Sequence, residues 1–116
     1  MDLVSCLFCK IASKEIPVKI VYEDEYCVVF PDIAPQAPVH LIAIPKKHLK
    51  NLAETPVNDY DILSHLLGVL KIQATEQKIS EKGYRIVLNT NSEGGQSVYH
   101  LHFHLLGGRT MNWPPG

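Results

Sequence analysis

The chain contains few cysteines and no long apolar run. Three cysteines among 116 residues is an odd number, and a chain of this length does not depend on a disulfide framework. No segment approaches the roughly 18–20 consecutive apolar residues of a membrane-spanning helix. Residues 1–15 show no basic segment followed by an apolar stretch, so we expect no signal peptide. These absences favour a reducing compartment without a membrane partner, and we expect the cytoplasm, or also the nucleus if the source is eukaryotic.

The chain also lacks a strong net charge. Its 11 basic and 12 acidic residues give −1 at pH 7, with both signs mixed along the sequence. A nucleic-acid polymer requires a basic stripe or patch, so we expect neither DNA nor RNA as a partner. A small anionic ligand needs only a few local donors and stays open. With 46% hydrophobic residues, the chain is expected to form one domain over residues 1–116.

Short apolar segments separated by turn residues predict an α+β fold. Residues 5–14 are expected to form a short helix with Ser5 at its N-cap and Pro17 at its end. Segments rich in β-branched and aromatic residues predict five strands, at 18–22, 26–30, 39–44, 84–89 and 97–106. Short connections between strands favour antiparallel pairing in one sheet.

One long helix is expected between the third and fourth strands. Thr55 suits its N-cap, Pro56 its first position and Lys82-Gly83 its end. Its sheet-facing side is predicted by apolar residues at helical spacing: Ile62, Leu63, Leu66, Leu67, Leu70 and Ala74. His65 is expected on the surface of this helix, and Cys27 in the core.

Three histidines alternate with apolar residues in the segment His100-Leu101-His102-Phe103-His104-Leu105-Leu106. In a strand these histidines would share one face, and the intervening residues would enter the core from the other. Three interpretations are open: a solvated polar face, a metal site, or catalysis by imidazole at phosphorus. We favour the third, because neutral imidazole, with an ordinary pKa of about 6.5, is a good nucleophile near neutral pH.

A glycine-containing loop, Gly94-Gly95-Gln96-Ser97, precedes the histidines. Main-chain N–H groups of such a loop can approach an anion without obstruction by side chains. The hydroxyl of Ser97 could then reach a phosphate or a leaving nitrogen. The simpler interpretation of the two glycines is a turn.

The histidine segment resembles the signature of the histidine triad (HIT) family. Further segments resemble its nucleotide-binding branch, at residues 32–40, 44–48, 94–99, 107–109 and 113–116. The resemblance implies a HIT-like fold with an antiparallel sheet of about five strands, one long helix, a short N-terminal helix, and a homodimer with a continuous sheet. It also implies a purine nucleoside phosphoramidase. Such an enzyme hydrolyses the P–N bond of adenosine 5′-phosphoramidates and adenylated lysine or amines through a nucleotidyl-histidine intermediate.

The resemblance further implies roles for individual residues. His102 would be the nucleophile, His104 would orient the phosphate and His102, and His40 would complete the hydrogen-bond chain that sets the tautomer. The implied nucleotide contacts are Asp32 for the ribose, Phe30 and Ile33 for the base, and Asn89, Gly95, Gln96 and Ser97 for the phosphate and leaving group. From the residues alone, Asp32 would cap a turn and Phe30 would belong to the core. The chemistry needs no cofactor. The alternatives are a nucleotide-binding interaction module with weak or vestigial hydrolase activity, and a zinc-stabilised scaffold.

The pair Cys6-Leu7-Phe8-Cys9 has the spacing of half a metal site. Some histidine triad proteins complete a zinc site with a histidine after a Pro-Lys pair and with the first triad histidine, which implies His48 and His100 as ligands here. Such zinc would be structural, because four protein ligands leave no open position. The alternative is a pair of buried thiols under the first helix. A redox pair is less well supported, because no thioredoxin-like βαβ pattern surrounds it.

Overall fold

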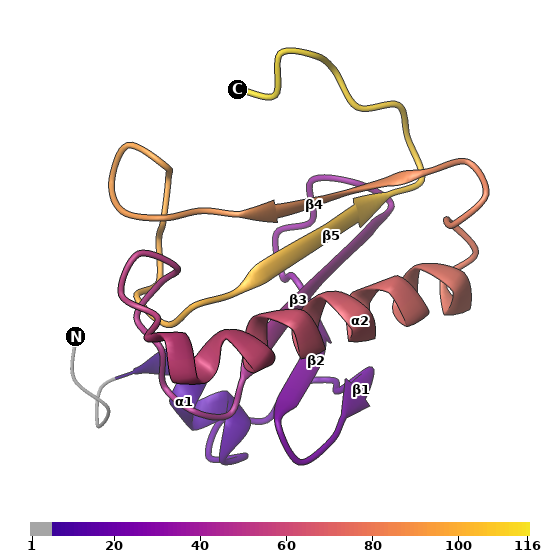
Figure 1. The fold of residues 1–116 in the computed structure, drawn as a ribbon. Coiled ribbons are helices and arrows are strands. Elements are labelled where there is room, and N and C mark those ends of the chain that lie inside the picture. The colour runs from indigo at the N-terminus through magenta and orange to yellow at the C-terminus, as the bar shows by residue number, and fades with distance from the viewer. Residues whose placement is uncertain (1–5) are drawn as a thin grey trace.

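The computed structural model describes residues 6–116, and Figure 1 shows their arrangement. The short helix α1 lies near the N-terminus, and the long helix α2 follows a 3₁₀ turn, η1. The elements are α1 (Leu7–Ala12), β1 (Tyr22–Glu23), β2 (Cys27–Pro31), β3 (Val39–Pro45), η1 (Val57–Asp59), α2 (Tyr60–Glu76), β4 (Tyr84–Leu88) and β5 (Phe103–Gly107). None of the described helices is long and apolar enough to cross a membrane.

The strands form one antiparallel sheet in the order β1-β2-β3-β5-β4. This confirms the predicted α+β class and the five strands. The central pair is β3 and β5, in which His40 lies opposite Leu106 and Ile42 opposite His104. The short helix, long helix and sheet of the predicted HIT-like fold are therefore all present.

Alternation along the central strands divides the core into two layers. Leu41, Phe103 and Leu105 point toward α2, where they pack with Leu66 and Leu70. The opposite face of the sheet packs against α1. The buried apolar residues of this second layer, from α1 and the sheet together, are Cys6, Phe8, Ile11, Val28, Phe30, Ile42 and Ile44. Because side chains alternate in a strand, His40 and His104 emerge on this second face, beside α1.

The apolar stripe of α2 is confirmed, with one exception. Leu66, Leu70 and Ala74 are buried, and Ile62 and Leu63 pack partly buried against them. Leu67 remains 43% exposed, and the sequence pattern missed the buried Val69. Cys27 is in the core as expected.

Both predicted ends of the long helix are wrong. Thr55 is buried and its hydroxyl donates to the carbonyl of Asn51, so it is not available as a cap. Pro56 precedes the 3₁₀ turn, and α2 begins only at Tyr60. The helix ends at Glu76 because Lys78 adopts a left-handed conformation with φ of 62°. Gly83, at φ 102°, instead leads into β4.

Three further element boundaries differ from the prediction. Helix α1 covers Leu7–Ala12 and is shorter than the predicted residues 5–14. The sulfur of Cys6 caps the helix by accepting a hydrogen bond from the N–H of Cys9. Ser5, the expected N-cap, lies outside the described residues. Strand β1 covers two residues rather than 18–22. Strand β5 begins at Phe103 rather than 97, because the preceding chain bonds to the segment after β3, for example through Leu101 N–H to Leu49 O.

Candidate active site and metal centre

His102 is buried directly before β5, and its hydrogen bond defines its tautomer. Its Nδ1 lies 2.8 Å from the main-chain carbonyl oxygen of His100. A carbonyl oxygen can only accept, so Nδ1 carries the proton and the lone pair of the neutral ring is on Nε2. Burial lowers the pKa of His102, which keeps the ring neutral near pH 7. Phe8 of α1 packs edge-on against the ring at 5.0 Å between centroids.

His40 and His104 form a second chain of oriented imidazoles. The N–H of Gln36 donates to Nδ1 of His40 at 3.0 Å, so the proton of neutral His40 is on Nε2. That proton is donated to Nδ1 of His104 at 2.8 Å, which leaves the proton of His104 on Nε2. Burial lowers the pKa of His40, and it lowers that of His104 to about 4. The His102 and His104 rings lie 5.0 Å apart.

Asp32 lies next to this chain. One of its carboxylate oxygens lies 3.4 Å from Nε2 of His40, and the other accepts from the N–H of Ala34. It therefore caps its own turn, as the residue-level interpretation has it, and also faces the histidines. Phe30 is buried against Phe8, whereas Ile33 is 98% exposed.

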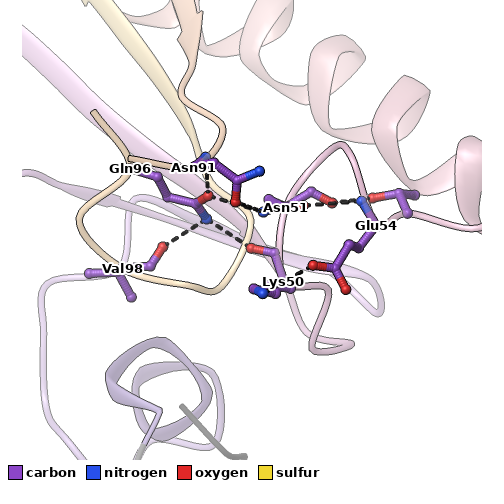
Figure 2. Close-up of polar contacts among 7 residues, drawn as sticks. Lys50, Asn51, Glu54, Asn91, Gln96 and Val98 are labelled. Atoms are coloured by element: carbon purple, nitrogen blue, oxygen red, sulfur yellow. Dashed lines mark hydrogen bonds and ion pairs between the residues drawn. The ribbon is translucent and has the colours of Figure 1, made fainter. Parts of the chain in front are cut away.

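The loop before the histidines is closed around the side chain of Gln96. Its Oε1 accepts from the N–H of Asn91, and its Nε2 donates to the carbonyls of Lys50 and Val98. Asn51, which is completely buried, donates to Asn91 and Gln96, as Figure 2 shows. Among the predicted nucleotide-site residues of this region, Asn89 is half-buried and Gly95 and Ser97 are exposed.

Sequence reasoning missed Gln36, Asn51 and Phe8. Gln36 acts through its main-chain N–H, which every residue except proline possesses, so its identity carries no signal. Phe8 stands between two cysteines and could be read only as an apolar residue of α1. Asn51 lies in a segment without periodicity, and only the fold shows that its amide is buried.

The four predicted metal ligands converge at one place. Cys6, Cys9, His48 and His100 offer ligand atoms that all lie within 4.8 Å of one another. Nδ1 of His100 lies 3.3 Å from the Cys6 sulfur and 3.5 Å from the Cys9 sulfur, and Nδ1 of His48 lies 3.2 Å from the Cys9 sulfur. Sulfur and nitrogen ligands of a tetrahedral zinc ion lie about 3.5 Å apart, so the spacing and the Cys₂His₂ donor set fit zinc.

Second contacts orient this cluster. Nε2 of His100 donates to the carbonyl of Pro45 at 2.8 Å, which turns the unprotonated Nδ1 toward the cysteines. Burial lowers the pKa of His100 to about 4 and also lowers that of His48, so both rings are neutral and able to bind a metal. Burial raises the pKa of the Cys9 thiol to about 11, so binding a metal would release a proton there. His100 thus points toward the cysteine pair, and Phe8 of α1 packs edge-on against both His100 and His102. Leu101, Phe103 and Leu105 enter the opposite layer, so the alternation predicted for this segment is confirmed.

Two other groups of polar residues lie outside this site. Asp24 accepts from His65 and from the Tyr22 hydroxyl, and it closes the turn between β1 and β2. His65 is therefore a helix-surface residue, as predicted, with a carboxylate partner. A hollow of about 550 Å³ lies beyond the end of α2, and no triad histidine lines it. Its basic lining residues are Lys78, Lys82, Arg85 and Arg109.

Known proteins resemble this chain in sequence and in overall fold. The family described as scavenger mRNA decapping enzyme C-term binding matches residues 5–113. A HIT-like protein of Synechococcus elongatus is 53% identical over 110 residues, which cover 95% of this chain and 96% of that protein. The chain belongs to the histidine triad family.

Three further proteins extend the comparison. A 14 kDa zinc-binding protein of Zea mays is 52% identical over 118 residues, covering 100% of this chain and 91% of that protein. The crystal structure of a HIT family hydrolase from Legionella pneumophila is 53% identical, with a TM-score of 0.95 over 97% of this chain and 100% of that one. A histidine triad nucleotide-binding protein from Candida albicans is 35% identical, with a TM-score of 0.81 over 95% of this chain and 83% of that one.

Proposed function

We propose that this histidine triad protein hydrolyses the P–N bond of purine nucleoside 5′-phosphoramidates, including adenylated lysine and amines. The observation that carries the proposal is the tautomer of His102, since its Nδ1 proton is committed to the His100 carbonyl. The lone pair on Nε2 is thereby available to a phosphorus atom. The description of similar proteins as hydrolases and as a nucleotide-binding protein supports the same class of activity.

The reaction would proceed in two displacements. Nε2 of His102 attacks the phosphorus, a new P–N bond forms to the ring, and the bond to the substrate nitrogen breaks. The departing nitrogen takes up a proton, and we assign the hydroxyl of Ser97 to relay it from solvent. Water then attacks the nucleotidyl-histidine, which releases the nucleoside monophosphate and a proton and restores the neutral ring.

The neighbouring histidines would stabilise the phosphate. With its proton on Nε2, neutral His104 is a donor suited to a phosphate oxygen, and His40 holds that tautomer through Nδ1 of His104. The N–H of Gln36 fixes His40 in turn. The hydrogen bonds of this chain therefore all donate in one direction, from the main chain through His40 and His104 to the phosphate.

The nucleotide would lie between the turn of Asp32 and the loop of Gly95. Asp32 is assigned to the ribose hydroxyls, Phe30 and Ile33 to the base, and Asn89, Gly95 and Ser97 to the phosphate and leaving group. Both side-chain N–H groups of Gln96 are already donated to carbonyls, so we assign it to shaping this loop. The ligand class is an AMP- or GMP-type purine nucleotide.

We also propose one structural zinc ion held by Cys6, Cys9, His48 and His100. When bound, the ion would crosslink α1, the segment after β3 and the segment before β5. The four protein ligands fill a tetrahedral shell, so zinc would stabilise the fold and take no part in the reaction. Three free cysteines fit a reducing compartment, and we place the protein in the cytoplasm.

A homodimer with a continuous sheet is supported by the position of β4. This strand is at the edge of the sheet, and all five of its residues are half-buried. An unpaired edge presents main-chain donors and acceptors to a second strand. Light scattering after size exclusion would test the proposal, and a monomer at micromolar concentration would reject it.

The function itself is tested by trapping the intermediate. The protein is mixed with an adenosine phosphoramidate, quenched in base, where phosphohistidine-type bonds persist, and digested for mass spectrometry. A nucleotidyl adduct on His102 is expected. Tight AMP binding without turnover or adduct would instead favour the second candidate, a nucleotide-binding interaction module.

A further inference from the structure

We propose that Asn51 is a positioning residue of this site, and that its amide acts through Gln96 to fix the main chain on both sides of Ser97. The inference rests on the proposed function, because Ser97 is assigned there to the leaving group. Asn51 belongs to neither the histidine signature nor the metal cluster. It lies on the chain between β3 and η1, far in sequence from the loop that it holds.

Both polar atoms of the buried Asn51 amide have hydrogen-bond partners. Its Nδ2 donates to Asn91 Oδ1 at 2.9 Å and to Gln96 Oε1 at 3.3 Å, and its Oδ1 accepts from the N–H of Glu54 at 3.0 Å. No buried polar side-chain atom among the described residues lacks a partner. Such a network is stable only when every member is present, because an unpaired buried polar group is costly.

The orientation of each amide follows from the partner before it. Gln96 must place Nε2 between the carbonyls of Lys50 and Val98, because both of these oxygens only accept. Its Oε1 must then face Asn51, which therefore has to present N–H groups. The network in Figure 2 thus admits one arrangement of the two amides.

Ser97 lies between two anchored neighbours. The Gln96 side chain reaches over it to the carbonyl of Val98 at 3.1 Å, and the Gln96 N–H donates to the carbonyl of Asn91 at 3.0 Å. Val98 also packs against the core layer beside α1. Ser97 itself is exposed, so its direction is set by these neighbours and not by contacts of its own.

Asn51 and the adjacent Lys50 hold this loop to the rest of the protein. Among residues 6–116, the side-chain hydrogen bonds that leave the segment 91–98 run to the Lys50 carbonyl or to the Asn51 amide. Removing the amide would leave Gln96 Oε1 with the Asn91 N–H alone. The loop would remain closed, but Ser97 would lose its fixed direction toward the reacting nitrogen.

The test compares Asn51→Ala and the milder Asn51→Ser with Thr55→Val. The control removes a buried 2.8 Å hydrogen bond to the carbonyl of the same Asn51 without touching the loop. With an adenosine phosphoramidate of an alkylamine, a poor leaving group, kcat should fall about 10- to 100-fold in the Asn51 variants, the scale of a small misplacement of a reacting group. With an arylamine, a good leaving group, the fall should be only a few-fold. Thr55→Val should have the kcat of the wild type with both substrates.

A double-mutant cycle with Ser97→Ala tests whether Asn51 acts through Ser97. If Asn51 acts by directing Ser97, its substitution should cost little more once that hydroxyl is absent. Equal losses for both leaving groups, additive with Ser97→Ala, would overturn the inference, as would Asn51 variants as active as Thr55→Val.

A readout independent of turnover separates this inference from the proposed function. The amide resonances of residues 95–98, with and without AMP, should shift in both Asn51 variants and not in Thr55→Val. Unshifted resonances would reject the positioning role. A wild-type protein that shows no turnover while the resonances still shift would reject the phosphoramidase assignment alone.

Discussion

The carbonyl oxygen of His100 accepts the Nδ1 proton of His102, while the ring of the same His100 faces Cys6 and Cys9. One residue therefore serves the proposed metal centre with its side chain and the proposed nucleophile with its main chain. The ring is also held by the carbonyl of Pro45. Because the link to His102 is a main-chain bond, the tautomer of the proposed nucleophile depends on the path of the chain at His100.

Replacing His102 by Ala should abolish turnover of an adenosine phosphoramidate. The expected fall in kcat is at least about a thousand-fold, the order found when a covalent nucleophile is lost. The other assigned nucleotide contacts remain, so the dissociation constant of AMP, measured by calorimetry, should change only a few-fold. His65→Ala is the matched control, since this histidine lies on the surface of α2 and pairs with Asp24. Turnover retained in His102→Ala would remove the enzymatic assignment.

Zinc should bind in a ratio of one per chain and should support stability more than activity. At free zinc about a hundred-fold above its dissociation constant, binding adds about 2.7 kcal/mol to the free energy of unfolding. Chelation should therefore lower the Tm clearly while kcat, measured below the transition, changes little. Cys9→Ser should lose the metal in elemental analysis.

Cys27→Ser provides the matched control for the metal experiment. This third cysteine is fully buried in the core beneath α2, apart from the four proposed ligands. The variant should keep its zinc even if it is less stable. Metal-free wild-type protein with reduced cysteines, or equal zinc loss in both variants, would contradict the proposed centre.

Acid should destabilise the protein between about pH 6.5, the ordinary histidine pKa, and pH 4. Burial lowers the pKa of His104 to about 4, so in this window the unfolded chain binds a proton that the folded chain does not. Stability therefore rises with pH across the window and is complete above the unfolded pKa. Urea unfolding at several pH values should show a shallower slope for His104→Gln than for the wild type. An identical slope would show that His104 does not titrate in this way.

Much of the fold was predictable from the sequence, because it depends on local alternation. Leu101, Phe103 and Leu105 enter the core beneath α2 as their spacing predicts. The Cys-x-x-Cys spacing and the family resemblance also named the four residues that converge. These features required only that each segment be read by itself or by its likeness to known segments.

What the sequence did not reveal depends on contacts between distant segments. Strand β5 does not extend back to His100. The N–H of Leu101 bonds to the carbonyl of Leu49, and the ring of His100 bonds to the carbonyl of Pro45. The start of α2 is displaced because Thr55 bonds backward to Asn51 rather than forward into a helix. Neither choice is visible in local propensity, since a hydroxyl or an N–H can satisfy several partners equally well.

The two loop glycines should respond differently to the same substitution, which separates a plain turn from an anion-binding loop. A Cβ at Gly94 would collide with the main-chain oxygen of Thr90 and lie 2.9 Å from its nitrogen. Backbone atoms cannot move aside cheaply, so Gly94→Ala should cost about 1–3 kcal/mol of stability, as overpacking does. Gly95, at φ 83°, has open space where its Cβ would be, so Gly95→Ala should cost only about 1 kcal/mol of backbone strain. If an anion is bound there, that methyl group would stand against it, and Gly95→Ala should weaken AMP binding by more than its small effect on the Tm suggests. Calorimetric titration of both variants decides the matter: unchanged AMP affinity in Gly95→Ala would leave the loop as a turn that the nucleotide does not touch.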